Sequence, residues 1–188
     1  NLRNIAKTLR QLEEISGSSK IEIAHEMEDL LAGSVELYED AARKQALLAG
    51  YAKKCEHNIS GDTIVVRLDQ LAANLEGKAD WMMKNIRANE WVKDGEDGWF
   101  NGYYDNHGRK VEGVMDESVR MMLTGQVFAI MSGTATEDQV ESICRSADKY
   151  LYDQKAGGYR LNTNFHEEKF DLGRMFGFSY GDKENGAV

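Results

Sequence analysis

Three loop segments carry the residue types that bind sugars. Each combines aromatic rings with amides, carboxylates and basic groups: Trp99, Tyr103, Tyr104, Asp105 and Asn106 in the first, Tyr159, Arg160, Asn162 and Asn164 in the second, and Arg174, Tyr180, Lys183, Glu184 and Asn185 in the third. Pyranose faces are apolar and pack on rings, while sugar hydroxyls hydrogen-bond to amides, carboxylates and cations. The mixture indicates a carbohydrate site, although polar loops with structural aromatic residues would have the same composition.

The third segment ends in the sequence GDKENG, which places three polar residues between two glycines, Gly181 and Gly186. Glycine lets the backbone turn sharply, so Lys183, Glu184 and Asn185 are expected to be exposed together on one loop. A surface turn without a function is the alternative.

Other common site chemistries lack their residue patterns. The chain has four histidines: His25, His57, His107 and His166. None stands at metal-ligand spacing from cysteine or acidic residues, no glycine-rich phosphate loop is present, and no nucleophile pairs with a histidine. Asp80 and Trp81 suit catalysis by type, but they fall inside a long predicted helix, where a structural role is expected.

Composition excludes several classes of protein. The chain has 188 residues, of which 41% are hydrophobic and 29% charged, as in a globular domain or part of a larger one. A net charge of −9 argues against a nucleic-acid or anionic-membrane partner. The longest apolar runs fall short of the ~20 residues that cross a bilayer. Two cysteines cannot form a disulfide framework, which favours a cytoplasmic location, and Cys144 is expected to be buried.

The first half of the chain has mostly helical periodicity. Apolar spacing predicts a helix over Leu2–Ile15, charged helices over Ile21–Leu31 and Val35–Cys55, and a long helix with a buried stripe over Val65–Ile86. The absence of proline also favours helix.

The second half alternates loops with helices. After Trp91 an aromatic, glycine-rich stretch reads as two extended pieces joined by a turn at DNHG. A buried helix start is expected over Gln126–Met131, then a helix capped by Thr136 whose inner face includes Cys144. The extended stretch GGYRLNTNF follows.

Four segments, in order, resemble a known family: GWFNGYYDNHGRKVEG, VRMMLTGQVFAIMSGTATEDQV, GGYRLNTNF and GRMFGFSYGDKENGAV. They resemble successive segments of the inverting glycoside phosphorylases of glycoside hydrolase family 94, the relatives of cellobiose phosphorylase, 1,2-β-oligoglucan phosphorylase and cyclic β-1,2-glucan synthase. Residues 1–63 carry no segment of the family and are predicted only as helical.

The resemblance implies an all-α fold in which residues 1–188 are part of an (α/α)6-barrel catalytic domain with long loops and short extended segments. It also implies cleavage of β-linked gluco-oligosaccharides by inorganic phosphate. An aspartic acid protonates the leaving oxygen while phosphate attacks the anomeric carbon, which gives an α-sugar 1-phosphate with inversion. Phosphate is then a co-substrate, no cofactor is implied, and a homodimer of the full-length protein is compatible with the resemblance.

The resemblance also assigns residues to the site. The sugar-contacting Lys-Glu pair of the family matches Lys183 and Glu184, and Gln126 lies in a helix-start segment that the family shares and is assigned to substrate binding. The family usually has tyrosine where this chain has Phe178, which bears on the acceptor sugar.

The catalytic acid is not assigned to any residue of this chain. In the family it lies in an Asp-Trp-Asn-Asp segment, of which Asp80 and Trp81 match only the first half. A phosphate-binding histidine is expected just past Val188. The 188 residues alone are therefore predicted to be inactive.

Two other classes of protein stay open. One is a non-catalytic carbohydrate-binding helical module, and the other is a hydrolase of the same barrel type, which would need a second carboxylate to activate water. The segments LTGQVFAIMSG and GGYRLNTNF favour β-1,2-linked glucan as the substrate.

Overall fold

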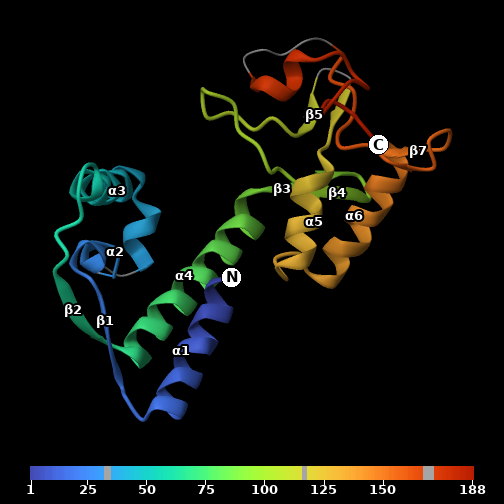
Figure 1. The fold of residues 1–188 in the computed structure, drawn as a ribbon. Helices are drawn as coiled ribbons and strands as arrows, with labels where there is room; N and C mark the ends of the chain where they lie inside the picture. Colours follow the sequence, from blue (N-terminus) through green and yellow to red (C-terminus); the bar gives the residue numbers. More distant parts are fainter. Residues whose placement is uncertain (32–34, 116–117, 167–171) are drawn as a thin grey trace. The chain divides into compact units, whose positions relative to one another are not determined.

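A computed structural model describes residues 1–31, 35–115, 118–166 and 172–188. The chain forms two compact units, Asn1–Lys84 and Asn85–Val188, and helix α4 (Leu68–Asn89) runs from one into the other (Figure 1). Within the described ranges, short strands pair into four antiparallel sheets of two strands each. The structure is therefore rich in helix, with short extended segments.

The first unit begins with helix α1 (Leu2–Ser16), which confirms the helix predicted over Leu2–Ile15. Gly17 ends it in the left-handed conformation. The remaining elements before α4 are β1 (Lys20–Ala24), η1 (His25–Met27), α2 (Glu28–Leu31), η2 (Val35–Glu39), α3 (Ala41–Cys55) and β2 (Thr63–Arg67). Helix α1 lies beside α4, and Asp80 of α4 forms an exposed ion pair with Arg3 of α1. A structural role for Asp80 stays a prediction.

The helix predicted over Ile21–Leu31 is wrong in its first half. Strand β1 pairs there with β2, with Ile21 opposite Val66 and Ile23 opposite Ile64. Isoleucines two positions apart share one face of a strand, and β-branched side chains favour that conformation. The same pairing removes Val65 from the predicted long helix and leaves it 62% exposed.

The helix predicted over Val35–Cys55 is interrupted. Helix α3 starts only at Ala41, because the side chain of Asp40 accepts a hydrogen bond from the Arg43 N–H over 3.0 Å and caps the helix. The residues before it form the 3-10 helix η2.

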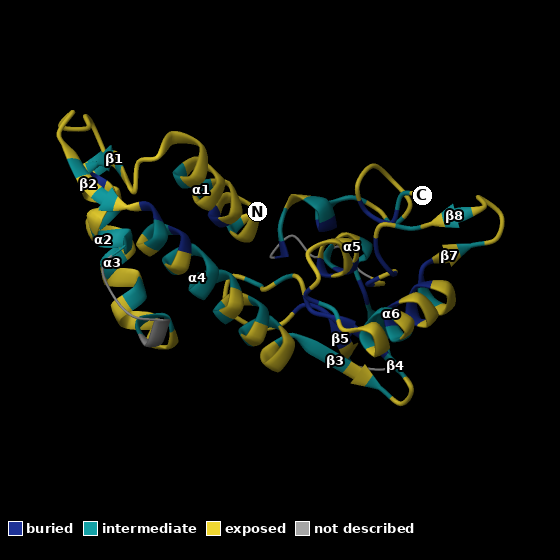
Figure 2. Ribbon diagram, turned by 90° about the horizontal axis from the view of Figure 1, so that it is seen from below, coloured by how far each residue is buried: buried dark blue, intermediate teal, exposed yellow. Residues whose placement is uncertain are grey.

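The second unit contains several hydrophobic clusters, and Trp99 lies in one of them. Its elements are β3 (Trp91–Asp94), β4 (Asp97–Phe100), β5 (Gly113–Met115), β6 (Ser118–Arg120), α5 (Leu123–Met131), α6 (Glu137–Tyr150), β7 (Tyr152–Asp153), β8 (Gly158–Tyr159) and η4 (Arg174–Gly177). Trp99 is fully buried against Met121, Ala147 and Leu151, so it belongs to the core rather than to a sugar site. Figure 2 shows the buried face of α6 turned toward β4.

Helix α6 starts where the sequence predicts. Thr136 and Gln139 form a capping box, in which each side chain accepts a hydrogen bond from the backbone N–H of the other residue. We expect Thr136→Ala to lower the free energy of unfolding by about 1 kcal/mol, because one helix-end N–H loses its partner. Urea denaturation followed by circular dichroism measures the loss, and Thr8→Ala on the exposed surface of α1 is the control. Equal losses in the two variants would exclude a capping role.

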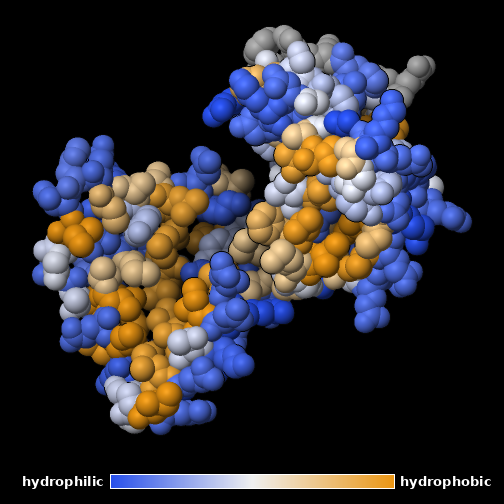
Figure 3. All heavy atoms as spheres, turned by 45° about the vertical axis from the view of Figure 1, so that its right-hand side comes forward, coloured by the Kyte–Doolittle hydropathy of each residue, from blue (hydrophilic) through white to orange (hydrophobic). Residues whose placement is uncertain are grey.

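Two burial predictions for the second unit are wrong. Cys144 is exposed, because the buried side of α6 is formed by Ile143, Ser146 and Ala147. Helix α5 buries Gln126 and Ala129 but exposes Phe128 (64%). The space-filling view shows hydrophobic atoms at the surface of both units (Figure 3). None of the helices in the described ranges is both long and apolar enough to cross a membrane.

Candidate functional site

The sequence GDKENG forms a tight turn, which we call the KENG turn (Gly181–Gly186). The Gly181 N–H donates to the Asn185 carbonyl over 2.7 Å, and the Asn185 N–H donates to the Asp182 carbonyl over 3.1 Å. Lys183 has a φ of 49°, a positive value of a kind that is uncommon outside glycine, and Gly186 has a φ of 69°. The backbone of the turn is thus held in one specific conformation.

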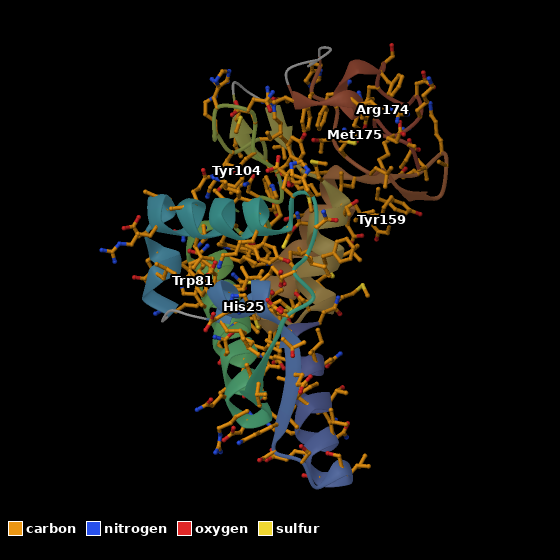
Figure 4. The ribbon with its side chains drawn as sticks, turned by 60° about the vertical axis from the view of Figure 1, so that its left-hand side comes forward. His25, Trp81, Tyr104, Tyr159, Arg174 and Met175 are labelled. Carbon is orange, nitrogen blue, oxygen red and sulfur yellow. The ribbon has the colours of Figure 1, made fainter. Side chains whose placement is uncertain are left out.

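Lys183 and Glu184 both extend from the turn into solvent, as the sequence predicts. The Lys183 ammonium lies 4.1 Å from the centroid of the Phe178 ring. Glu184 lies 3.5 Å from the guanidinium of Arg174, which is labelled at the surface of the second unit in Figure 4. A cation, a carboxylate and an aromatic ring therefore meet at one exposed place, with the polar groups and the apolar face that a sugar requires.

Asn185 does not share this exposure, which corrects the expectation that all three polar residues of the turn face outward. Its side chain is buried and its Nδ2 donates to the Phe178 carbonyl over 2.7 Å. Gly186 is buried beside it against the ring of Tyr180. Asn185 and Gly186 therefore form a buried anchor that attaches the turn to the second unit.

We expect Gly186→Ala to destabilise the protein by about 2 to 4 kcal/mol. A Cβ at this position would lie 2.2 Å from the Tyr180 ring, and the positive φ would add backbone strain. Gly157→Ala is the matched control, since Gly157 has a nearly identical φ of 68° with no atom near the new Cβ. Thermal unfolding compares the two. Equal losses would show that the contact with Tyr180 does not matter.

Gln126 is placed elsewhere, on the buried side of α5, where it is 1% exposed. Its Oε1 accepts the Phe100 N–H over 2.7 Å, and its Nε2 donates to the carbonyls of Phe100 (2.8 Å) and Met122 (3.0 Å). These bonds tie β4 to α5 and do not reach the KENG turn. A contact of Gln126 with substrate stays a prediction.

Glu112 lies next to Gln126 and is a buried carboxyl group that the sequence does not single out. Its Oε1 accepts the Gly102 N–H and its Oε2 accepts the Met122 N–H, each over 2.7 Å. Burial raises the pKa of Glu112 to about 7, and these two hydrogen bonds oppose the rise. The close approach of Gly102 and Gly125 beside this carboxyl leaves little room for a side chain at either glycine.

The first aromatic segment has mainly structural contacts. The Tyr103 hydroxyl donates to the Leu172 carbonyl over 2.5 Å, and the Tyr104 hydroxyl donates to Glu90 over 2.6 Å. The predicted turn at DNHG is confirmed, since Asp105 and Arg109 bond across it and Tyr104 pairs with Lys110. The interpretation of these residues as structural is therefore the better one.

The second segment lies under the KENG turn. The extended stretch that the sequence predicts is confirmed by β8 and by the bridge between Met122 and Asn162. Arg160 donates to the Gly186 carbonyl over 2.6 Å, and the amide of Asn162 bonds to both Asn185 and Gly186. Asn162 thus supports the turn from inside, a role that its sequence context does not reveal. Among the described residues, no cluster of histidine, cysteine and acidic side chains has the arrangement of a metal site.

Comparisons with known proteins identify the family of this chain. Residues 66–188, which include the KENG turn, match the model of the glycosyl hydrolase 94 superfamily, catalytic domain. The chain is 31% identical over 122 residues to a solabiose phosphorylase of Paenibacillus borealis, which covers 65% of this chain and 15% of that protein. It is also 31% identical over 140 residues to a cellobionic acid phosphorylase of Neurospora crassa. That alignment covers 73% of this chain and 16% of the phosphorylase.

The chain thus spans about one sixth of the length of these curated relatives. The matched region contains the three segments described above and all of the second unit. The chain belongs to the glycosyl hydrolase 94 superfamily, and its matched residues are part of the catalytic domain of that family.

Proposed function

We propose that this chain is part of the catalytic domain of a glycoside phosphorylase. In this proposal the whole protein cleaves a β-linked gluco-oligosaccharide with inorganic phosphate and releases an α-sugar 1-phosphate with inversion. The observation that carries the proposal is the KENG turn, inside the matched catalytic region, with Lys183 and Glu184 exposed on a buried anchor. Two relatives that are named as phosphorylases support it.

Each exposed group of the turn would have a separate task. The Glu184 carboxylate would accept hydrogen bonds from sugar hydroxyls, and the Lys183 ammonium would donate to a sugar oxygen. Phosphate is already an anionic nucleophile, so it needs positioning opposite the leaving group rather than a base to activate it. One carboxylic acid is then enough to protonate the leaving oxygen.

The proposal includes the architecture around the turn. An (α/α)6 barrel would place these loops at one end of its helices, with residues 1–63 as a helical segment of the same domain. The general acid and the phosphate-binding histidine would come from elsewhere in the full-length protein. The 188 residues alone are then expected to bind sugar without turning it over. A homodimer and a cytoplasmic location stay predictions.

The decisive experiment uses the full-length protein that contains these residues. It is incubated with a panel of β-linked glucose disaccharides, including the β-1,2 isomer, with and without inorganic phosphate. Phosphorus NMR detects sugar 1-phosphate, and the proton coupling of the product assigns its anomer. An α-1-phosphate formed only with phosphate is expected. Phosphate-independent release of glucose would instead indicate the hydrolase, and binding without turnover would indicate the carbohydrate-binding module.

A further inference from the structure

Asn162 occupies a fixed place in the second unit. It is completely buried (0% exposed) and forms an antiparallel bridge with Met122. On either side of it, the Leu123 N–H donates to the Leu161 carbonyl over 2.8 Å, and the Thr163 N–H donates to the Met121 carbonyl over 3.0 Å. The backbone of Asn162 is therefore held by the segment that leads into α5.

The side chain of Asn162 makes three hydrogen bonds. Its Oδ1 accepts the Gly186 N–H over 2.7 Å, and its Nδ2 donates to the Asn185 Oδ1 and to the Thr163 carbonyl, each over 2.9 Å. Two of the three partners belong to the KENG turn. The reverse orientation of the amide would point its NH₂ group at the Gly186 N–H, so only one orientation satisfies all the partners.

These bonds fix the end of the turn that directly follows the exposed pair. Asn185 connects Asn162 to the rest of the turn. Its Nδ2 donates to the Phe178 carbonyl, and its carbonyl accepts the Gly181 N–H. Phe178 in turn carries the ring beneath Lys183. The place of the Lys183 ammonium thus depends on one buried amide from another loop.

We propose that Asn162 is a positioning residue for the sugar site, which holds Lys183 and Glu184 in place through Asn185 and Gly186. This inference rests on the proposed function, because it takes the exposed pair of the turn as the sugar-binding groups. Asn162 itself, being buried, touches no substrate. Its effect on the reaction is mediated by the conformation of the turn.

Asn162→Asp is the sharpest variant, since it retains the size and the Oδ1 acceptor but loses the NH₂ group that donates to Asn185 and to the Thr163 carbonyl. In the full-length protein we expect kcat/KM for the oligosaccharide to fall at least tenfold at pH 8, with KM for phosphate within twofold of the wild type. At pH 5.5 we expect the introduced carboxyl group to be protonated, because burial favours the neutral form, so that its O–H can donate one hydrogen bond again. The rate relative to wild type should therefore recover on acidification.

Two further variants separate positioning from general damage. Asn162→Ala should lose as much activity at pH 8 but show no recovery at pH 5.5, because alanine cannot donate. Asn89→Asp is the matched control at an exposed side-chain amide that donates to Asn85 of the same helix, and its kinetics should equal those of the wild type. If the Asn162 variants do not fold, Asn185→Ala removes the same hydrogen bond from the other partner.

Hydrogen exchange tests whether Asn162 fixes the conformation of the KENG turn, and it does not require an activity measurement. In the full-length protein, peptides that cover residues 179–188 should exchange at least tenfold faster in Asn162→Asp than in the wild type, while peptides of α6 do not change. A loosened turn with unchanged kinetics in an active protein would overturn the inference. An unchanged exchange rate would also overturn it. A wild-type protein without phosphorolysis would instead refute the proposed function and, with it, the link from Asn162 to the sugar.

Discussion

Replacing Glu184 by glutamine, or Lys183 by alanine, is expected to lower kcat/KM for phosphorolysis by about 100-fold in the full-length protein. Each variant removes a charged group that would hydrogen-bond to the sugar next to the bond that breaks. Because both side chains are exposed, their loss leaves no buried partner unsatisfied. The free energy of unfolding should therefore change by less than about 0.5 kcal/mol.

The matched controls for this pair lie elsewhere in the second unit. Lys155→Ala removes an exposed lysine from the loop between β7 and β8, and Glu141→Gln neutralises an exposed carboxylate on α6. Both should retain wild-type kinetics. If the turn variants lost no more activity than these controls, the KENG turn would not be the sugar-binding site.

The stability of the protein is expected to fall as the pH rises from 5 to 8, because of Glu112. Burial raises the pKa of this carboxyl from 4.5 to about 7. Between those values the folded protein holds a proton that the unfolded chain releases, so its stabilising contribution is complete below pH 4.5 and is lost above pH 7. The loss between pH 5 and pH 8 should amount to roughly 3 kcal/mol. Urea denaturation at half-unit pH steps measures it.

Glu112→Gln should flatten this slope, because glutamine does not titrate. We expect the variant to be less stable at every pH, since its NH₂ group must face one of the two backbone N–H donors. The slope and not the absolute value is therefore the diagnostic quantity. Glu137→Gln, at an exposed position in the first turn of α6, should retain the full slope. A wild-type slope in Glu112→Gln would assign the pH dependence to another group.

Local signals in the sequence were enough for several elements of the fold. Helices α1 and α6 combine amphipathic spacing with clear ends, a glycine after the first and a threonine cap before the second. The turn at DNHG was equally predictable from its own residues. In each case the structure depends on interactions between residues a few positions apart.

The errors arose where distant partners decide the structure. Lys20–Ala24 becomes a strand because Thr63–Arg67 lies beside it, and a five-residue segment has too few positions for its period to be certain. Cys144 is exposed although Ile143 next to it is buried, because β4 packs on the other side of α6. Apolar periodicity shows that a face exists but not where its edge lies.

The candidate site was predictable only in its exposed part. Lys183 and Glu184 follow from the family resemblance, and the structure places both in solvent. Glu112 and Asn162 are buried behind the loops, yet a polar residue in a glycine-rich loop normally faces water. Their burial depends on backbone groups of Gly102, Met122 and Gly186, which approach only in the folded chain.

The chain has two cysteines, and each unit contains one of them: Cys55 at the end of α3 and Cys144 on α6. Both are free thiols, and Cys144 is the more exposed. A maleimide reagent at limiting concentration should therefore react first with Cys144, and a second reagent can follow at Cys55. These 188 residues thus accept a pair of spectroscopic labels, such as two nitroxides or a donor and an acceptor dye, without any substitution within them.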